Sequence, residues 1–292
     1  MGKRKWINFY NLLKATRTER AMIPFSFIMI AVGFADFINL EVIILSICCV
    51  LLYASGGILN AKVDGDFEVR YVSVFASILI LTSVVLSFYN FIIFLSVLGW
   101  IFLSFIYNKY SRKILFGDSV MLSLTHVGLP IFSACFLLDF HLDFTLKLTT
   151  FMFASFLFLV PIKNLNGAEK DIEKGYKTLM TLFKDGKTIT YVLFNIYVIL
   201  MFLSYFIFDL DEKFLIMFAF ILMLKIFMDY CLYNGREVLT YRCARLVIIL
   251  FSFSFVFVNA SNLKIIFMSF TLVALGIFWL VAGKTPEVKQ EV

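Results

Sequence analysis

Charged residues are scarce in this sequence, and so is proline. Asp, Glu, Lys and Arg make up only 16% of the 292 residues, whereas soluble domains carry roughly 25%. The four prolines form no proline-rich linker, and the chain has neither a short-period repeat nor a low-complexity segment. These shortages argue against a soluble protein and against a second domain. We therefore expect a single integral membrane domain over residues 1–292.

Cysteine and histidine are also few, and their spacing argues against two kinds of structural site. The five cysteines have neither C-x-x-C spacing nor a histidine nearby, so they predict neither a zinc site nor a disulfide framework. We expect them to be small apolar packing residues. Of the two histidines, His126 falls in an apolar run, where we expect its hydrogen bonds to be satisfied, and His141 falls in a short loop.

Long apolar runs dominate the chain, which is 62% hydrophobic with a mean hydropathy of +0.94. A helix of about 17–25 apolar residues crosses the hydrocarbon core of a bilayer. Ten runs approach this length, near 22–39, 41–60, 71–87, 89–107, 118–138, 145–162, 189–208, 213–233, 245–258 and 264–282. The ninth run is short, and Asn259 to Lys264 separates it from the tenth. The pattern predicts an all-α, polytopic transmembrane helical bundle of nine or ten spans.

Lysine and arginine gather in alternate loops. When ten spans are threaded, all but four of the 26 fall on one side of the membrane, in residues 1–21, 61–70, 108–117, 163–188, 232–245 and 283–292. An excess of Lys and Arg marks cytoplasmic loops, so we expect a multi-pass protein of the cell membrane with both termini in the cytoplasm. Basic loops of this kind match the anionic headgroups of membrane lipids, and we expect no nucleic-acid partner.

Two polar clusters follow apolar runs on the predicted cytoplasmic side. Asn60, Asp64 and Glu68 recur at i, i+4 and i+8, so they would share one face of a helix. Asn164 and Asp171 lie two helical turns apart and would also share a face. Mg²⁺ takes oxygen ligands and is commonly held by one or two carboxylates together with substrate phosphates. The clusters therefore predict a site for Mg²⁺ and a diphosphate, unless they are only solvated loop charges.

Basic residues that could contact a diphosphate lie close to both clusters. Negative charge develops on a diphosphate as its C–O bond breaks, and cations and a metal ion stabilise it as a leaving group. The candidates for this role are Arg17, Lys62, Arg70, Arg112, Lys113 and Lys177.

Both clusters are similar to the motifs of one protein family. Asn60, Asp64 and Glu68 match N-D-x-x-D-x-x-x-D at the end of the second helix, and Asn164 and Asp171 line up with D-x-x-D-x-x-x-D after the sixth. On these residues the chain resembles the UbiA superfamily of intramembrane prenyltransferases, as a divergent member.

Three further stretches carry the same resemblance in the order found in the family. Residues 175–179, Gly-Tyr-Lys-Thr-Leu, resemble G-x-K-T-L. Residues 107–118 resemble Y-x(4)-K-R-x(3)-G-N, with Asp118 at the last position. Thr16 and Arg17 resemble the T-R that opens the first helix. The motifs thus span residues 16–179 and fall at the expected helix ends.

The resemblance implies a UbiA-like fold with nine spans and a cytoplasm-facing central cavity. It also implies an Mg²⁺-dependent transferase of lipid biosynthesis that moves an isoprenoid chain from a prenyl diphosphate to an aromatic or lipid-headgroup acceptor. Asp64 and Asp171 would then be catalytic, and the metal ligands would be Asn60, Asp64, Glu68, Asn164 and Asp171. Tyr53 and some of the 37 phenylalanines would line the same cavity. The prenyl chain length and the acceptor have no motif and are not predicted.

Three carboxylates of the family motifs are missing, because the chain has Ala61, Asn164 and Gly167 at their positions. Asp66, Glu169 and Glu173 would compensate only in a non-helical geometry, since on an ideal helix they point away from the two faces. A UbiA-like protein that binds lipid but has lost catalysis is therefore an alternative.

A charged pair inside the eighth run supports a third alternative. Lys225 and Asp229 lie at i, i+4, roughly 12 and 6 Å from the cytoplasmic end of the run at the helical rise per residue. Ionisable residues at such depth mark a transport pathway or an ion pair that braces a bundle. The polar clusters at helix ends favour the enzyme over a transporter, because transporters place broken helices at the membrane midplane.

Overall fold

The computed structural model describes residues 18–35, 37–64, 72–165, 168–258 and 264, and within these ranges it contains helices and no strand. The main helices are α2 (Thr18–Phe34), α3 (Leu40–Asp64), α4 (Val72–Ser87), α5 (Phe91–Lys109), α6 (Gly117–Ser123), α7 (Leu129–Leu137), α8 (Leu142–Leu159), α11 (Gly186–Ile207), α12 (Lys213–Tyr233) and α13 (Glu237–Val258). Shorter elements are the 3₁₀ turns η1 (Ser111–Lys113) and η3 (Val160–Leu165), the π-helical turn η2 (Leu124–Gly128), α9 (Ala168–Glu173) and α10 (Leu179–Leu182).

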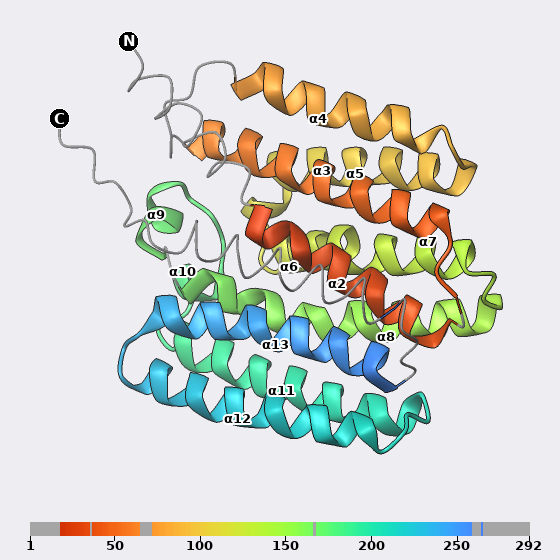
Figure 1. Cartoon of the computed structure of the whole chain (residues 1–292). Helices are drawn as coiled ribbons and strands as arrows, with labels where there is room; N and C mark the ends of the chain where they lie inside the picture. Colours follow the sequence, from red (N-terminus) through yellow and green to blue (C-terminus); the bar gives the residue numbers. More distant parts are fainter. Residues whose placement is uncertain (1–17, 36, 65–71, 166–167, 259–263, 265–292) are drawn as a thin grey trace, which may run out of the picture.

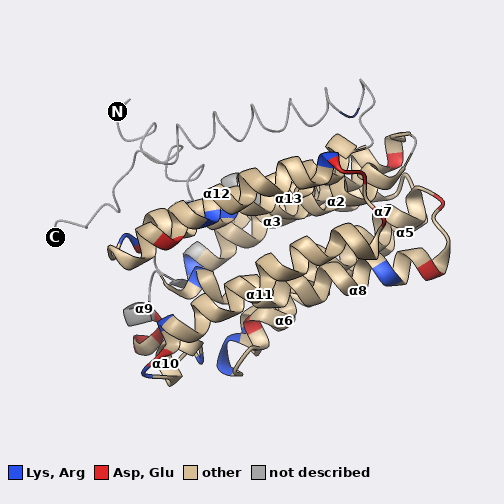
Figure 2. Ribbon diagram, turned by 90° about the horizontal axis from the view of Figure 1, so that it is seen from below, with Lys and Arg blue, Asp and Glu red and all other residues tan. Residues whose placement is uncertain are grey.

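The long helices run side by side in two layers (Figures 1 and 2). In one layer the packing order is α4, α3, α2, α13 and α12, and in the other it is α5, α6–α7, α8 and α11. Contacts of α4 with α5, of α2 with α7 and of α11 with α12 join the layers. The short helices α9 and α10 lie at one end of the bundle (Figure 1).

Among the described residues, seven segments are long and apolar enough to cross a membrane: residues 40–60, 91–113, 117–137, 142–165, 186–207, 213–233 and 237–258. Two shorter apolar helices, Met22–Phe34 and Ser73–Ser87, are also present. Nine of the ten predicted runs are therefore helical. The tenth run falls outside the described residues apart from Lys264.

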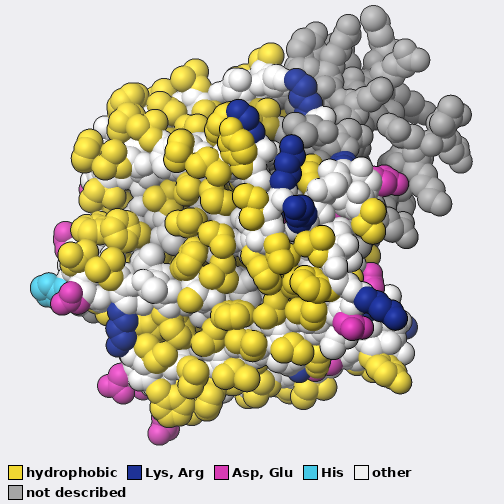
Figure 3. All heavy atoms as spheres, turned by 180° about the vertical axis from the view of Figure 1, so that it is seen from behind, with side chains coloured by type: hydrophobic (Ala, Val, Ile, Leu, Met, Phe, Trp, Pro, Cys, Tyr) yellow, Lys and Arg dark blue, Asp and Glu magenta, His cyan; other side chains and the backbone are white. Residues whose placement is uncertain are grey.

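The surface of the bundle is that of a protein in lipid. Large apolar side chains on the outer faces are well exposed, for example Phe91 (72%), Leu81 (63%) and Ile226 (67%). Figure 3 shows one such face, which is mostly hydrophobic. Figure 2 shows most of the charged residues at the two ends of the bundle. Apolar side chains in this arrangement match the hydrocarbon core, and the charged ends match the two interfaces.

The helix α13 corrects one predicted boundary. The apolar run begins at Arg245, so residues 232–245 were expected to form a cytoplasmic loop; instead α13 begins at Glu237, and only Asn234 to Arg236 separate it from α12. Arg245 can lie within a helix at this depth because its guanidinium stacks 4.1 Å from the ring centroid of Tyr241 and lines an internal cavity. The ninth run is thereby extended to a helix of 22 residues.

The predicted span at 118–138 is not a regular helix. The amide of Leu129 donates to the carbonyl of Leu124, five residues back, and so closes the π-helical turn η2. Pro130 follows directly and has no N–H to donate to the carbonyl of His126. A widened turn before a proline relieves the clash of its ring with that carbonyl, and such turns are frequent at functional sites.

The helices α2 and α13 approach closely at Gly33. A Cβ atom at this position would lie 2.8 Å from the backbone carbonyl carbon and oxygen of Phe255. The two backbones can therefore touch only because residue 33 has no side chain, which is the usual role of small residues between membrane helices. This contact fixes α13 against the centre of its layer.

Candidate functional site

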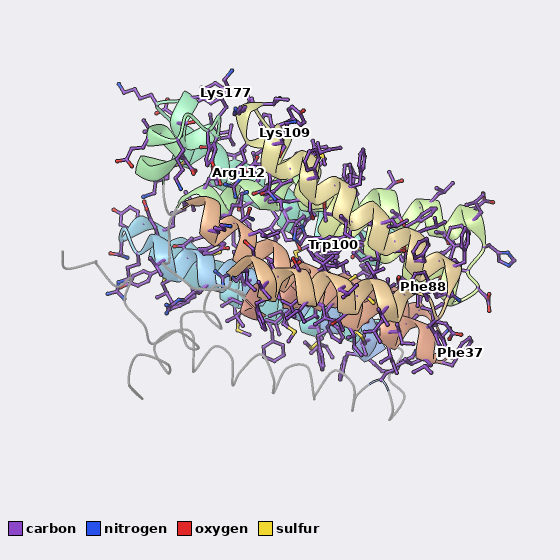
Figure 4. The ribbon with its side chains drawn as sticks, turned by 90° about the horizontal axis from the view of Figure 1, so that it is seen from above. Phe37, Phe88, Trp100, Lys109, Arg112 and Lys177 are labelled. Atoms are coloured by element: carbon purple, nitrogen blue, oxygen red, sulfur yellow. The ribbon has the colours of Figure 1, made fainter. Side chains whose placement is uncertain are left out.

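A cavity of about 770 Å³ lies between the two helix layers, toward the end that carries α9 and α10. Residues of α3, α5, η1, α6, η2, η3, α9 and α13 line it. We define its polar end by six lining residues: Asn60, Arg112, Asp118, Lys163, Asn164 and Asp171. Figure 4 places Arg112 toward the bundle end that carries Lys177, Trp100 about halfway along, and Phe37 and Phe88 at the opposite end.

A buried ion pair occupies the polar end. Nζ of Lys163 lies 2.9 Å from Oδ2 of Asp118, and the exposed fractions of the two side chains are 27% and 8%. Nδ2 of Asn164 donates to the same carboxylate oxygen at 3.4 Å, and Nζ of Lys163 also lies 3.4 Å from the hydroxyl oxygen of Tyr107. A charge removed from water needs such a set of partners. Residues of α5, α6 and η3 are therefore held together at one point.

Arg112 is held between two tyrosine rings. The guanidinium carbon lies 5.1 Å from the ring centroid of Tyr107 and 5.0 Å from that of Tyr176, and Nη1 donates to the Tyr176 hydroxyl at 3.1 Å. The amide of Lys177 donates to the carbonyl of Arg112, and the amide of Tyr176 donates to that of Asp171. A planar guanidinium stacked in this way is fixed in orientation, which suits the recognition of phosphate oxygens. The segment after α9 is thus attached to η1.

The structure places some of the predicted metal ligands on the cavity and does not describe the others. Asn60, Asn164 and Asp171 all line the cavity. Asn164 and Asp171 do not share one helical face, however, because η3 ends at Leu165 and α9 begins at Ala168. Glu68 and the side chain of Asp64 lie outside the described residues. Within the described part of the chain, no group of three or more His, Cys, Asp and Glu residues is arranged to hold a metal ion.

Of the basic residues predicted to contact a diphosphate, the structure places only some on the cavity. Arg112 lines the cavity, whereas Lys62, Lys113 and Lys177 are exposed and do not line it. Nζ of Lys62 instead donates to Oγ of Ser73 on α4 at 2.7 Å. Arg17 and Arg70 lie outside the described residues. The cations that the structure places on the cavity are Arg112, Lys163, Lys174 and Arg245.

Deeper in the cavity, three ring-bearing side chains meet, and we call them the aromatic layer: Tyr53 of α3, Trp100 of α5 and His126 of η2. The His126 ring lies edge-on to the other two, with centroid distances of 4.9 Å to Tyr53 and 5.4 Å to Trp100. All three line the cavity. The helical rise puts this layer about 10–12 Å from the polar end. The cavity therefore joins a charged end to an apolar, aromatic interior.

Lys225 and Asp229 lie away from this cavity. The two side chains form an ion pair of 2.5 Å, and Nζ of Lys225 also donates to the hydroxyl of Tyr191 on α11 at 3.2 Å. Neither residue is among those that line the cavity. The pair therefore braces α12 against α11.

Comparison with known families identifies the chain. The model of the UbiA prenyltransferase family matches residues 61–238, more than half of the sequence. The chain belongs to the UbiA prenyltransferase family. No curated protein matches it. Membership in this family, together with the seven apolar spans, makes it an integral, multi-pass membrane protein.

Solved structures of other UbiA proteins share the fold. A UbiA homologue from Aeropyrum pernix K1 is similar at 13% identity, with a TM-score of 0.64 over 82% of this chain and 96% of the homologue. A UbiA homologue from Archaeoglobus fulgidus, solved with DMAPP and Mg²⁺, gives 15% identity and a TM-score of 0.58 over 85% and 99%. The same homologue solved with GPP and Mg²⁺ gives 16% identity and a TM-score of 0.53 over 92% and 99%. The UbiA fold therefore extends over most of the chain.

Compared with the UbiA motifs, this chain has an aspartate where one motif has asparagine and an asparagine where the other has aspartate. Asp118 stands where the motif Y-x(4)-K-R-x(3)-G-N ends in asparagine, and Asn164 stands where D-x-x-D-x-x-x-D begins with aspartate. The two side chains are hydrogen-bonded to each other at 3.4 Å. Asp118 thus places a carboxylate beside Asn164, whereas Glu173 is exposed and does not line the cavity.

Gly117 of the UbiA motif is explained by the turn that positions Asp118. Phe116 adopts the left-handed conformation with φ of 60°, and the amide of Gly117 donates to the carbonyl of Ile114. A Cβ atom on Gly117 would collide with the carbonyl oxygen of Ser111. Only glycine therefore allows α6 to begin directly against η1, which brings Asp118 beside Lys163.

The structure adds site residues that the sequence does not predict. Lys163 belongs to a predicted basic loop, and its place directly before Asn164 is the one local signal for a site. Asp118 stands out in the sequence only as a motif position. Arg245 and Glu237 come from a helix with no family motif, and nothing in their local sequence points to a cavity.

Proposed function

We propose that this UbiA-family protein is an intramembrane prenyltransferase that moves an isoprenoid chain from a prenyl diphosphate to an aromatic or lipid-headgroup acceptor. One observation carries the proposal: a single cavity joins an end lined by Arg112, Lys163 and Asp171 to an interior lined by apolar and aromatic side chains. A prenyl diphosphate has the same two parts. Its charged head fits the polar end, and its hydrocarbon chain fits the interior.

The diphosphate head would be held by Arg112 and Lys163. The Arg112 guanidinium is kept in one orientation by the two tyrosine rings, and Nζ of Lys163 is positioned by Asp118 and Tyr107. When the allylic C–O bond breaks, its electron pair goes to the diphosphate oxygen. Cations already fixed around that oxygen stabilise the developing charge without reorganisation. Lys174 and Arg245 add positive charge to the same cavity.

The donor set of the polar end fits Mg²⁺. Asn60, Asn164 and Asp171 present oxygen atoms, which hard cations prefer, and Mg²⁺ commonly uses only one or two carboxylates together with substrate phosphates. Asp64 and Glu68 are proposed as further ligands on their sequence positions. Bound there, Mg²⁺ would supply positive charge against the diphosphate oxygens. The Archaeoglobus fulgidus homologue, solved with DMAPP or GPP and Mg²⁺, supports this choice of substrate and metal.

The allylic cation left after ionisation would be shielded by the walls of the cavity. Rings such as Tyr53 and Trp100 present π-electron faces or edges to the interior and keep water away from it. Aromatic faces stabilise nearby cations by about 0.5–2 kcal/mol. The acceptor then attacks the cation with an oxygen or carbon atom and loses a proton. Loss of the diphosphate and gain of the acceptor complete the transfer.

The polar end is proposed to face the cytoplasm. The basic segments 163–188 and 108–117 both lie at this end of the bundle, and Lys and Arg are concentrated in cytoplasmic loops. A prenyl diphosphate could then enter from the cytoplasmic side, and the isoprenoid product would remain in the membrane.

The test is a transfer assay with matched variants of α9. Purified protein in lipid is given prenyl diphosphates radiolabelled in the isoprenoid chain and extracted membrane lipids, and a labelled lipid product that has lost the donor's diphosphate is expected from the wild type with Mg²⁺. Asp171→Asn should abolish it. Glu173→Gln should not, because Glu173 lies on the same short helix but is exposed and away from the cavity. Asp64→Ala should behave like Asp171→Asn.

Other outcomes would support the other functions. Binding of the radiolabelled diphosphate without any labelled lipid would favour a UbiA-like lipid-binding protein that has lost catalysis. A solute flux that Asp229→Asn abolishes, with Asp171→Asn harmless, would favour a transporter. Equal product from the wild type and from Asp171→Asn would reject the proposed role of the polar end.

A further inference from the structure

His126 lines the aromatic layer of the cavity, and one of its ring nitrogens has no hydrogen-bond partner among the described residues. Nδ1 lies 3.0 Å from the carbonyl oxygen of Leu122, one turn earlier in the same segment. Because a carbonyl only accepts, this contact places the proton on Nδ1. Nε2 then carries a lone pair, and among the residues that the structure describes none forms a hydrogen bond with it.

The surroundings of His126 favour the neutral ring. No ion pair joins it to a carboxylate of the described residues, and the cations Lys163 and Arg245 line the same cavity. The other groups packed against the ring are Tyr53 and Trp100, from two different helices. A neutral imidazole protonated on Nδ1 is a hydrogen-bond acceptor at Nε2.

The backbone around His126 is also irregular. The residue lies in the π-helical turn η2, before Pro130, so the side chain projects from a widened turn. Such turns are frequent at functional sites, and an ionisable residue within a membrane span is a candidate functional residue. The three ring-bearing side chains come from α3, α5 and η2 and meet inside the cavity.

We infer that Nε2 of His126 accepts a hydrogen bond from the hydroxyl group of the prenyl acceptor, whose body lies against Tyr53 and Trp100. This inference rests on the proposed function. The isoprenoid chain has only C–H groups and the diphosphate belongs to the polar end, about 12 Å away at the helical rise. Of the two substrates, only the acceptor can supply an O–H donor in the aromatic layer. His126 would thus select hydroxyl-bearing acceptors.

The direct test uses the fact that the chain has only two histidines. Protein labelled with ¹⁵N-histidine and carrying His141→Gln, at the exposed start of α8, shows His126 alone in nitrogen NMR spectra in lipid nanodiscs. We expect a protonated Nδ1 and an unprotonated Nε2. Addition of p-cresol should move the Nε2 resonance in the direction of hydrogen-bond acceptance, whereas its methyl ether, which has no donor, should leave it in place. Equal responses to the two probes would overturn the inference.

Two variants separate hydrogen bonding from packing. His126→Phe keeps an aromatic ring between Tyr53 and Trp100, and His126→Gln keeps an acceptor. The preference for p-cresol over its methyl ether should fall roughly three- to tenfold in His126→Phe, the value of one neutral hydrogen bond, and should be partly retained in His126→Gln. An unchanged preference in His126→Phe would make His126 a packing residue only.

The same variants distinguish this inference from the proposed function. Mg²⁺-dependent binding of a radiolabelled prenyl diphosphate should be unchanged in His126→Phe, because the polar end is intact, while the labelled lipid product should decrease. If the wild type binds no prenyl diphosphate, the proposed function fails, whatever the NMR result. If it binds and His126→Phe forms product as fast as the wild type, only the inference about His126 fails.

Discussion

At the residue scale, the polar end of the cavity depends on one carboxylate. Oδ2 of Asp118 receives both Nζ of Lys163 and Nδ2 of Asn164. Charged groups removed from water are costly unless they are paired, so each partner needs the others. Lys163 can face a diphosphate in a fixed position only as long as a carboxylate holds it there.

Exchange of the two side chains should therefore be tolerated, whereas the single change should not. Asp118→Asn leaves Lys163 without an anion, and we expect a loss of about 1.5–3 kcal/mol in the free energy of unfolding, the range for a hydrogen bond to a charged group. In the double variant Asp118→Asn/Asn164→Asp a carboxylate returns within reach of Lys163. Thermal unfolding in detergent measures the stability of the single and the double variant. If the double variant is no more stable than Asp118→Asn, the prediction that the two side chains can be exchanged is contradicted.

Arg112 should not be replaceable by lysine. A lysine ammonium keeps the charge but loses the planar stacking between Tyr107 and Tyr176 and the directed donor to the Tyr176 hydroxyl. We expect Arg112→Lys to weaken prenyl diphosphate binding about tenfold, which corresponds to about 1.4 kcal/mol. Lys113→Ala is the control, because this neighbour is exposed and does not line the cavity. Equal affinities of Arg112→Lys and the wild type would show that charge alone suffices.

At the element scale, the close contact of α2 with α13 can be tested through its glycine. Gly33→Ala places a Cβ atom 2.8 Å from the Phe255 backbone, so the helices must separate. We expect a loss of about 1–3 kcal/mol, as for other overpacked sites. Gly56→Ala in α3 is the matched control, since nothing lies within 4 Å of its Cβ position. It should be neutral or stabilising, by up to about 1 kcal/mol from helix propensity. The measurement is the unfolding temperature of each variant. A lower unfolding temperature for Gly56→Ala than for Gly33→Ala would contradict the close contact of α2 with α13.

The helices were largely predictable from the sequence, and the exceptions have physical causes. Apolar runs predict spans because every backbone group in lipid must bond within its own helix. This rule placed α3, α5, α11 and α12 close to their observed bounds. It failed at the start of α13, where charged residues interrupt the apolar run, because Glu237 and Arg245 line an internal cavity.

The candidate site was only partly predictable. Motif positions brought Asn60, Asn164, Asp171 and Arg112 to the cavity. The partnership of Lys163 with Asp118 was not visible, since it joins residues 45 positions apart through the packing of η3 on α6. Whether a lysine in a loop faces a cavity or solvent depends on the tertiary fold, as the exposed Lys113 and Lys177 illustrate.

At the scale of the whole molecule, two helix layers enclose a cavity that is polar at one end only. The predicted topology places that end in the cytoplasm. Cysteines introduced at Lys177, beyond α9, and at His141, at the start of α8, should react with a membrane-impermeant thiol reagent from opposite sides. The five native cysteines are buried, so their background should be small. Lys177→Cys should be labelled only in inside-out vesicles and His141→Cys only in intact cells. Labelling of both from one side would contradict the topology.

The most direct test of the central claim is equilibrium binding of radiolabelled geranyl diphosphate to the protein in lipid nanodiscs, with Mg²⁺ and with EDTA. The account predicts saturable binding that requires Mg²⁺, that Asp171→Asn and Lys163→Ala abolish, and that Glu173→Gln and Lys177→Ala leave intact. Absence of binding to the wild type, or equal binding to all four variants, would contradict the claim that this cavity binds a prenyl diphosphate.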